Sequence, residues 1–427
     1  MSEYAFKSAV ALASAIAAKE VSSLELTDMY IDRVESLDPD INAVVVKDFE
    51  RGREDARAAD SAVAAGKALG PLHGVPMTIK EAYDIKGLPT TWGFPEFEHN
   101  IATTDSEMVV RMKRAGAHFF GKTNVPRSLA DFQSFNDIYG TTNNPWDLER
   151  TPGGSSGGSA AALAAGLTGL EAGSDIGGSI RNPAHFCGIY GHKPTWGVVS
   201  DAGHALPGQV APADIAVVGP MARSAEDLKI SMDLSAGASS HDVAGWQLNL
   251  PKPSKTHLKD FRVAIWTNDD MAPVSQEISD RVQSIGDMLS RLGATVSDSA
   301  RPEIDIEESH DTYNSLLWGV MAAELSAEEK SEYHARLGQL DPNDRSIAAN
   351  MIRYSVQSHG NWTENNNKRF LIRQRWQRFF NDWDIVICPQ TATTAFPQDE
   401  GGYLERKIIV DNVEQDYFQQ VFWSGLV

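Results

Sequence analysis

The chain has 427 residues, of which 42% are hydrophobic and 22% charged, so it is long enough for one large globular domain or two smaller ones. Its 58 acidic and 38 basic side chains give a formal net charge of −20, which argues against nucleic acid and an anionic membrane surface as partners. No segment resembles a secretory leader or a bilayer-spanning helix, and two cysteines are too few for a disulfide framework, so we expect a cytoplasmic protein.

Helix and strand signals alternate along the N-terminal part of the chain. Ser22-Ser23-Leu24-Glu25 has the pattern of a capping box, and apolar residues follow at helical spacing until Asp38-Pro39, where we expect the helix to end. A short apolar run that leads into Lys80 predicts a buried strand with this lysine at its end. This strand covers 75–79, and the other predicted elements are strands over 43–46 and 117–120 and helices over 50–69 and 105–115.

The alternation continues toward the C-terminus. The pattern predicts helices over 159–167, 224–235 and 276–292, strands over 261–266, 294–296 and 385–388, and a mostly helical block over 304–380. Strands interleaved with helices indicate a layered α/β fold. Because no linker or internal repeat divides the sequence, we expect a single domain over residues 1–427, with the helical block as an excursion from its core.

A Gly/Ser-rich stretch over 153–181 holds two serine clusters flanked by glycine, Ser155-Ser156 and Ser179. Glycine lets other groups approach the backbone closely, so such loops expose N–H groups at low steric cost. In Ile176-Gly177-Gly178-Ser179, successive amides precede a hydroxyl, and the amides could bind a carbonyl oxygen while the hydroxyl attacks its carbon. From this pattern alone, a tight turn between a strand and the next element is the more frequent interpretation.

Two other glycine motifs are disfavoured in this stretch. The residues around Ser155 and Ser156 match the G-x-S-x-G nucleophile elbow of α/β-hydrolases, but that motif requires a strand immediately before the serine, and the preceding NNPWDLERTP is polar and broken by proline. A phosphate-binding loop would need Gly-Lys-Ser/Thr at a helix start or G-x-G-x-x-G after a strand, and neither pattern is present here.

A serine nucleophile needs a base. His185, His192 and His204 are the nearest histidines in sequence, but no neighbouring pattern distinguishes one of them. Lys80 is the stronger candidate, because a lysine at the end of an apolar strand is partly desolvated and desolvation disfavours its charged form. A structural ion pair between Lys80 and Glu81 or Asp84 remains the alternative.

The motifs GVPMTIKEAYDIKGLPTTWG, GKTNVP, YGTTNNPWDLERTPGGSSGGSAAALAAG, GSDIGGSIRNPAHFCGIYGHKPTWGVV, VGPMARSAEDL and VICPQTATTAFP, in this order, resemble those of the amidase signature family. The resemblance covers nearly the whole chain. It implies that family's α/β fold, a mixed twisted β-sheet core with helices on both faces. It also implies hydrolysis of a small-molecule amide, with no metal and no organic cofactor.

The resemblance also implies roles for individual residues. Ser179 corresponds to the family's nucleophile, Ser155 to a bridging serine that follows a cis peptide bond, and Lys80 to the terminal base that also serves as the acid. The remaining roles are an oxyanion hole made by the amides of Ile176, Gly177, Gly178 and Ser179, and a supporting set made by Ser156, Asp175 and Arg181.

Several points stay open at the sequence level. Arg127 stands where the family often has a glutamate, and the family usually continues beyond a segment like FWSGLV, so we expect its C-terminal part to be missing from residues 1–427. One alternative function is the glutaminase subunit of a tRNA-dependent amidotransferase, which the stretch DAGHALPGQVAPADIAVVGPMARS disfavours. Another is a non-catalytic or impaired family member. The substrate and a homodimeric state are not specified by the sequence.

Overall fold

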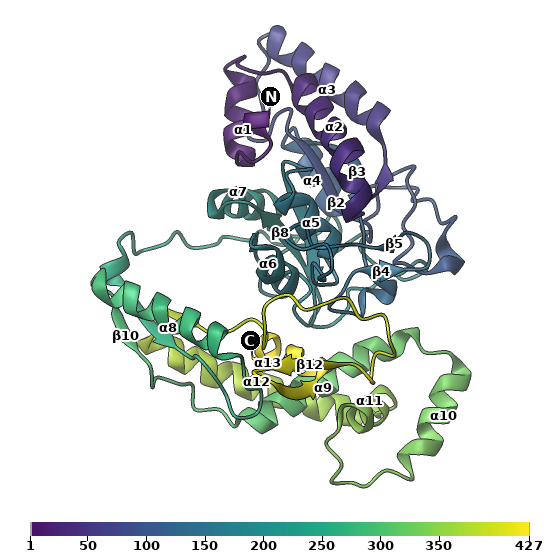
Figure 1. The fold of residues 1–427 in the computed structure, drawn as a ribbon, viewed down its shortest axis with the longest axis vertical. Coiled ribbons are helices and arrows are strands. Elements are labelled where there is room, and N and C mark those ends of the chain that lie inside the picture. Colours follow the sequence, from purple (N-terminus) through teal and green to yellow (C-terminus); the bar gives the residue numbers. More distant parts are fainter. Residues whose placement is uncertain (1, 427) are drawn as a thin grey trace. The chain divides into compact units, whose positions relative to one another are not determined.

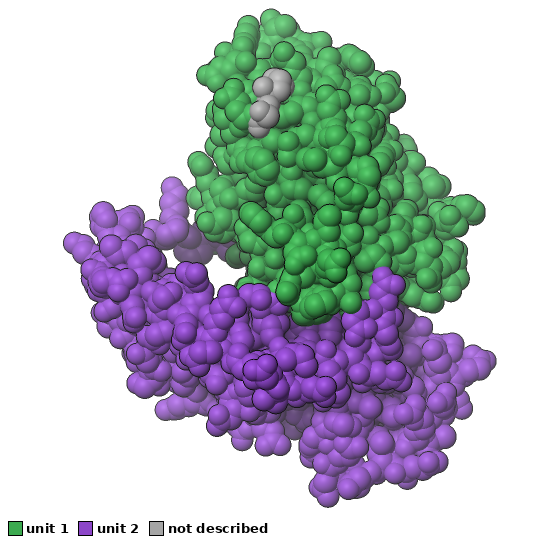
Figure 2. Space-filling view, viewed as in Figure 1, with its two compact units in different colours: residues 1–212, 216–249, 395–398 green, residues 213–215, 250–394, 399–427 purple. Residues whose placement is uncertain are grey.

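The structure is a computed structural model that describes residues 2–426. The chain forms two compact units, coloured separately in Figure 2. Unit 1 comprises Met1–Pro212, Ala216–Asn249 and Ala395–Gln398, and unit 2 comprises Ala213–Ile215, Leu250–Thr394 and Asp399–Val427. Single-domain behaviour over residues 1–427 stays a prediction. Among the described residues, no helix is both long enough and apolar enough to cross a membrane.

Unit 1 contains two three-stranded sheets. In the first, of order β1-β3-β2, β3 (His118–Thr123) pairs antiparallel with β1 (Val44–Lys47) and parallel with β2 (Pro76–Lys80). In the second, of order β6-β8-β7, β8 (Val217–Ala222) pairs antiparallel with β6 (Glu171–Asp175) and β7 (Tyr190–Gly191). Strands β2 and β6 lie beside each other, and the Thr78 hydroxyl donates to the Glu171 carboxylate between them.

Helices cover these strands. The helices of unit 1 are α1 (Ala9–Ala17), α2 (Ser23–Ile41), α3 (Phe49–Ala64), α4 (Glu107–Arg114), α5 (Gly157–Ala164), α6 (Arg181–Cys187) and α7 (Ala225–Ser235). Helix α3 packs against β3, α7 against β8, and α5 against β2, β3 and β6 (Figure 1). Helix α5 approaches its neighbours closely because it begins with glycine: a Cβ on Gly158 would lie 2.3 Å from the Asn124 amide nitrogen. The remaining strands are β4 (Phe135–Asn136) and β5 (Gly140–Thr141), and the 3₁₀ turns are η1 (Ser2–Tyr4), η2 (Pro95–Phe97) and η3 (Arg127–Leu129).

Unit 2 is built on a parallel sheet of order β10-β9-β11. Buried Val263 and Ile265 of β9 pack with Val282 of α8 to form an apolar core. The strands are β9 (Arg262–Ile265), β10 (Thr295–Ser297), β11 (Ile385–Ile387) and the hairpin β12 (Lys407–Val410) and β13 (Val413–Asp416). The helices are α8 (Gln276–Arg291), α9 (Ile306–Met321), α10 (Ala327–Leu337), α11 (Ile347–Ser355), α12 (His359–Asp382) and α13 (Val421–Gly425), with 3₁₀ turns η4 (Leu258–Asp260), η5 (Ala322–Glu324) and η6 (Tyr417–Gln420).

The predicted end of the second helix is wrong. The capping box at Ser22 and Glu25 forms, but α2 continues through Pro39 to Ile41. The chain leaves the helix at Asn42, which has a φ of 57°. The carboxylate of Asp38 accepts the amides of Ala43 and Val44 at 2.7 and 3.0 Å, and these bonds fix the turn into β1 in place of a helix stop at the proline.

Candidate active site

The Lys80 side chain ends inside a cluster of serine hydroxyls. Strand β2 is buried along its length and carries Lys80 as its last residue, with no exposed surface on the side chain. Its Nζ donates to the hydroxyls of Ser155, Ser156 and Ser174 at 2.6, 3.0 and 2.9 Å. Because no carboxylate of the described residues bonds this ammonium directly, the ion pair with Glu81 or Asp84 that the sequence left open does not form.

The environment of Lys80 favours a neutral amine. Burial lowers the pKa of Lys80 to about 7, although the charges of Asp175 and Glu171 act in the opposite direction. Ser156 is also the residue that precedes α5, so the positive end of this helix faces the amine and further disfavours its protonation. A substantial fraction of Lys80 is therefore able to accept a proton at neutral pH.

The loop that carries Ser155 depends on two glycines. The Gly154-Ser155 peptide bond is cis, as the family resemblance implies, and Gly153 has a φ of 89°. A Cβ on Gly154 would lie 2.4 Å from the carbonyl oxygens of both Asp131 and Gln133, so only glycine fits. The Gly154 amide also donates to the Asn182 side-chain oxygen at 3.2 Å. These close contacts hold Ser155 at the Lys80 amine.

Ser179 lies in the turn between β6 and α6, and Asp175 organises this turn. The Asp175 carboxylate accepts the amides of Gly178, Ile180 and Arg181 at 2.9, 3.0 and 3.2 Å. The Arg181 guanidinium adds two bonds, from Nε at 3.0 Å and from Nη2 at 2.8 Å. Burial opposes ionisation of Asp175, but the Arg181 charge outweighs it and holds the pKa of this carboxyl well below its usual range.

The two serine segments are joined through the backbone. The Ser156 amide donates to the Ser179 carbonyl oxygen at 3.1 Å. Ser155 is 1% exposed and Ser179 is 6% exposed, so the nucleophile predicted at 179 retains more solvent access than the serine predicted to relay its proton. The structure therefore brings Lys80, Ser155 and Ser156 into direct contact and ties Ser179 to them through one main-chain bond.

The amides predicted to form an oxyanion hole differ in their engagement. The Gly178 amide already donates to Asp175, whereas the amides of Gly177 and Ser179 have no acceptor among residues 2–426. Gly178 has a φ of 116°, a conformation that favours glycine and turns the chain into Ser179. Of these three amides, those of Gly177 and Ser179 are the ones available to a substrate oxygen.

Of the three candidate histidines, His204 is the one that lies near Lys80. Its ring packs on Tyr83 at 4.6 Å and on Trp92 at 5.2 Å between centroids. Burial lowers the pKa of His204 to about 3, and the nearby charge of Lys80 lowers it further. A ring with this pKa is a weak proton acceptor, so the geometry favours Lys80 over His204 as the base.

Sequence reasoning missed two polar residues of β6. Ser174 accepts a bond from Lys80, and Glu171 is buried beside it with a pKa that burial raises to about 8. Strand β6 has the sequence EAGSD and is buried throughout, so it offers no apolar run that would mark it as a strand. The available signal was its position directly before the nucleophile turn, where a short strand was needed.

Arg127 lies at the surface. Its side chain is 53% exposed, pairs with Glu96 at 3.4 Å and lies over the Phe94 ring at 4.8 Å. These contacts assign it to surface charge. Among the described residues, no group of three or more His, Cys, Asp or Glu side chains has an arrangement that would hold a metal ion.

Comparison with known proteins agrees with this architecture. Residues 25–423 match the family described as Amidase. An acylamidase of Rhodococcus erythropolis is 33% identical over 395 residues, which cover 91% of this chain and 80% of that protein, and a glutamyl-tRNA(Gln) amidotransferase subunit from Acidothermus cellulolyticus is 32% identical over 94% of this chain and 83% of its own. The solved structure of fatty acid amide hydrolase superposes with a TM-score of 0.80 at 26% identity and covers 99% of this chain and 72% of that chain, and a bacterial aryl acylamidase of the amidase signature family gives the same score at 24% identity over 99% and 88%. The expected α/β fold is confirmed, and the chain belongs to the amidase signature family of hydrolases.

Proposed function

We propose that the protein hydrolyses a small carboxylic amide to a carboxylate and ammonia or an amine, through an acyl-enzyme on Ser179. One observation carries this proposal: the buried Lys80 amine, whose pKa is lowered to about 7, lies 2.6 Å from the Ser155 hydroxyl. An amine held neutral against a hydroxyl is the arrangement that a serine nucleophile needs for activation.

The first half of the reaction transfers one proton in each direction. Neutral Lys80 accepts the Ser155 proton while Ser155 accepts the Ser179 proton, and the Ser179 oxygen adds to the amide carbon. The amides of Gly177 and Ser179 donate to the negative oxygen of the tetrahedral intermediate. The proton on Lys80 then returns through Ser155 to the departing nitrogen, because an amine leaves readily only when it is protonated.

The second half releases the acid. A water molecule gives its proton to the same relay and attacks the acyl carbon, and the bond to Ser179 breaks as the proton returns to its oxygen. In this scheme Asp175 and Arg181 position the nucleophile turn and do not exchange protons with the substrate. The scheme requires neither a metal nor an organic cofactor.

The relatives support an amide substrate without specifying which one. They include the acylamidase, and an indoleacetamide hydrolase of Bradyrhizobium diazoefficiens that is 32% identical over 98% of this chain and 76% of its own length. Similar identity to the amidotransferase protein keeps a glutaminase role as the second candidate. Simple-amide turnover by the purified single chain, independent of tRNA, would favour the amidase, whereas activity on glutamine alone in a multi-subunit complex would favour the second candidate.

A fluorophosphonate probe tests the nucleophile. We expect it to label the native chain and Ser36→Ala, a control at an exposed serine, but not Ser179→Ala. Lys80→Ala should retain Ser179 and lose most of the labelling rate. Unchanged labelling and amide turnover in Ser179→Ala would disprove the proposal and leave a binding protein as the better interpretation.

A further inference from the structure

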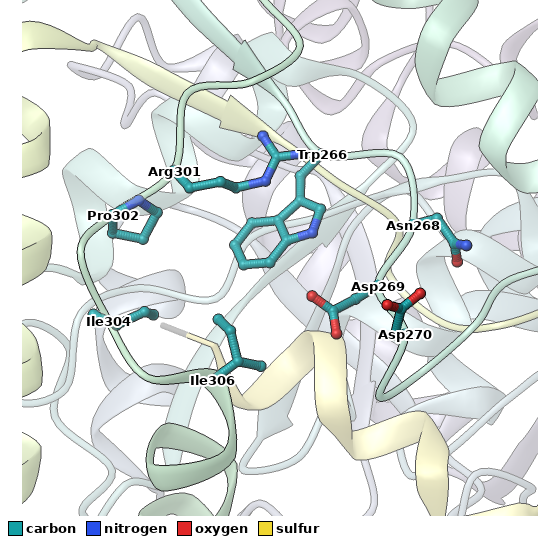
Figure 3. Close-up of a pocket in the computed structure, with 8 residues that line it drawn as sticks. All are labelled: Trp266, Asn268, Asp269, Asp270, Arg301, Pro302, Ile304 and Ile306. Atoms are coloured by element: carbon teal, nitrogen blue, oxygen red, sulfur yellow. The ribbon is translucent and has the colours of Figure 1, made fainter.

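A cavity of about 350 Å³ lies within unit 2, and none of the residues predicted for catalysis lines it. Its wall combines one cation, two carboxylates and apolar side chains. The lining residues are Trp266, Asn268, Asp269, Asp270, Arg301, Pro302, Ile304 and Ile306 (Figure 3).

The cavity is formed by segments that follow two neighbouring parallel strands. Residues 266–270 come directly after β9, and residues 301–306 follow β10 and lead into α9. Since β9 and β10 run in the same direction, both segments leave the sheet at its carboxyl edge. This edge is where open α/β sheets bind small ligands.

Arg301 is held in place with part of its guanidinium unused. Its Nη1 donates to the carbonyl oxygens of Ile265 and Ala300 at 2.9 and 2.7 Å, and the group lies 4.7 Å from the centre of the Trp266 ring. The Trp266 ring is itself buried and packs edge-on against Trp423 at 5.9 Å. Within residues 2–426, Nε and Nη2 of Arg301 have no hydrogen-bond acceptor. A fixed cation with free donors suits a carboxylate ligand.

Two carboxylates lie on another side of the same cavity. In the view of Figure 3, Arg301 lies above the Trp266 indole, and Asp269 and Asp270 lie below it. One oxygen of Asp269 accepts the Met271 amide at 3.0 Å, which fixes this loop, while the Asp270 carboxylate has no bond within the described residues. An ammonium group is the natural partner for this pair.

We propose that this cavity binds a small zwitterion, an α-amino acid with an apolar side chain. Its carboxylate bonds Arg301, its ammonium group lies between Asp269 and Asp270, and its side chain packs on Ile304 and Ile306. A simple amine would leave the Arg301 donors unused and would be repelled by their charge, and a simple carboxylate would be repelled by the two aspartates. The zwitterion is the small-molecule class that pairs with both sides.

Calorimetric titration with three probes of the same shape tests this assignment. L-leucine carries both charges, 3-methylbutylamine lacks the carboxylate, and 4-methylpentanoate lacks the ammonium group. We expect L-leucine to bind in the millimolar range and each analogue to bind about tenfold more weakly or worse. Equal binding of the amine and L-leucine would overturn the zwitterion in favour of an organic cation, and the absence of L-leucine binding would overturn the site.

Variants locate the binding. Asp269→Asn/Asp270→Asn should weaken L-leucine by about tenfold, and Arg301→Lys, which keeps the charge but not the fork of donors, should weaken it by a similar factor. Glu303→Gln removes a nearby exposed carboxylate that does not line the cavity and should change nothing. Ser179→Ala should bind L-leucine as the native chain does. Loss of binding in Ser179→Ala, or in Glu303→Gln to the same extent as in the double variant, would overturn the assignment.

Discussion

Lys80 and Lys122 are both fully buried and lie on neighbouring strands, yet their surroundings differ. Burial lowers the pKa of Lys80 to about 7 and that of Lys122 to about 8. Lys80 donates to three serine hydroxyls, whereas Lys122 donates to the Pro89 carbonyl and the Thr90 hydroxyl and interacts with the charge of Glu81. Desolvation is therefore common to both lysines, and the chemistry of their partners distinguishes them.

That difference separates a base from a structural cation. A hydroxyl can give a proton to a neutral amine and take one from another hydroxyl, so Ser155 can extend the reach of Lys80 toward a nucleophile. A carbonyl oxygen such as that of Pro89 accepts hydrogen bonds but has no proton to give. The account thus assigns activity to Lys80 and stability to Lys122, and each prediction below tests one part of this contrast.

The largest effect is expected from matched methionine substitutions. Lys80→Met should lower kcat/KM by about 10⁴-fold or more, since it removes the proton acceptor. Lys122→Met should lower the free energy of unfolding by about 3 kcal/mol, because Glu81 is left buried without an opposite charge, and should lower the activity by less than about tenfold. Initial rates and urea unfolding of both variants measure the contrast. Equal losses of activity would show that the two lysines are not distinguished in this way.

The next effect concerns the turn that carries Ser179. Asp175→Asn leaves the Arg181 guanidinium without its carboxylate and weakens three amide bonds, so we expect a loss of about 3 kcal/mol of unfolding free energy and of about 10²-fold in kcat. Asp384→Asn is the control, because Asp384 pairs with Arg262 in unit 2. It should leave kcat unchanged; a matching loss in both variants would mean that Asp175 acts only through stability.

A smaller effect is expected at Ser174. This hydroxyl accepts a bond from the Lys80 ammonium, so Ser174→Ala removes a group that favours the charged form. The acidic limb of kcat/KM against pH should move to lower pH by about 0.5 to 1 unit. A shift toward higher pH would show that Ser174 favours the neutral amine instead.

The smallest effect is expected at Arg127. Its guanidinium is exposed and its ion pair with Glu96 is long, so Arg127→Gln should change the unfolding free energy by less than about 0.5 kcal/mol and kcat/KM by less than about twofold. Steady-state kinetics and thermal unfolding check both values. A loss of activity of tenfold would place Arg127 at the substrate, contrary to its surface contacts.

The sequence predicted the elements whose burial follows a simple apolar pattern. The capping box of α2, the strand that leads into Lys80 and the amphipathic helix α8 all form close to their predicted positions. Strand β6 escaped detection because its buried residues are small or polar. Similarly, Pro39 was taken as a helix stop, although the bonds from Asp38 allow the helix to include it.

The candidate site divides in the same way. The family resemblance identified Ser155, Ser179 and Lys80, and geometry adds the Lys80 contacts that the pattern alone could not provide. Ser174 and Glu171 were not predicted, since contacts between β2 and β6 depend on how distant strands pack. The substrate depends on the side chains of a pocket that no sequence motif describes, so it remains a matter for experiment.

The central claim is that neutral Lys80 activates Ser179. The most direct test is the rate of fluorophosphonate labelling of Ser179 as a function of pH, because this reaction requires activation of the nucleophile but no departure of an amine. A lysine with a depressed pKa is protonated and inactive below that pKa and neutral above it. We predict a labelling rate that rises with pH through a single midpoint at about 7. A rate that is flat across the neutral range, or a midpoint near the ordinary pKa of lysine, would contradict the account.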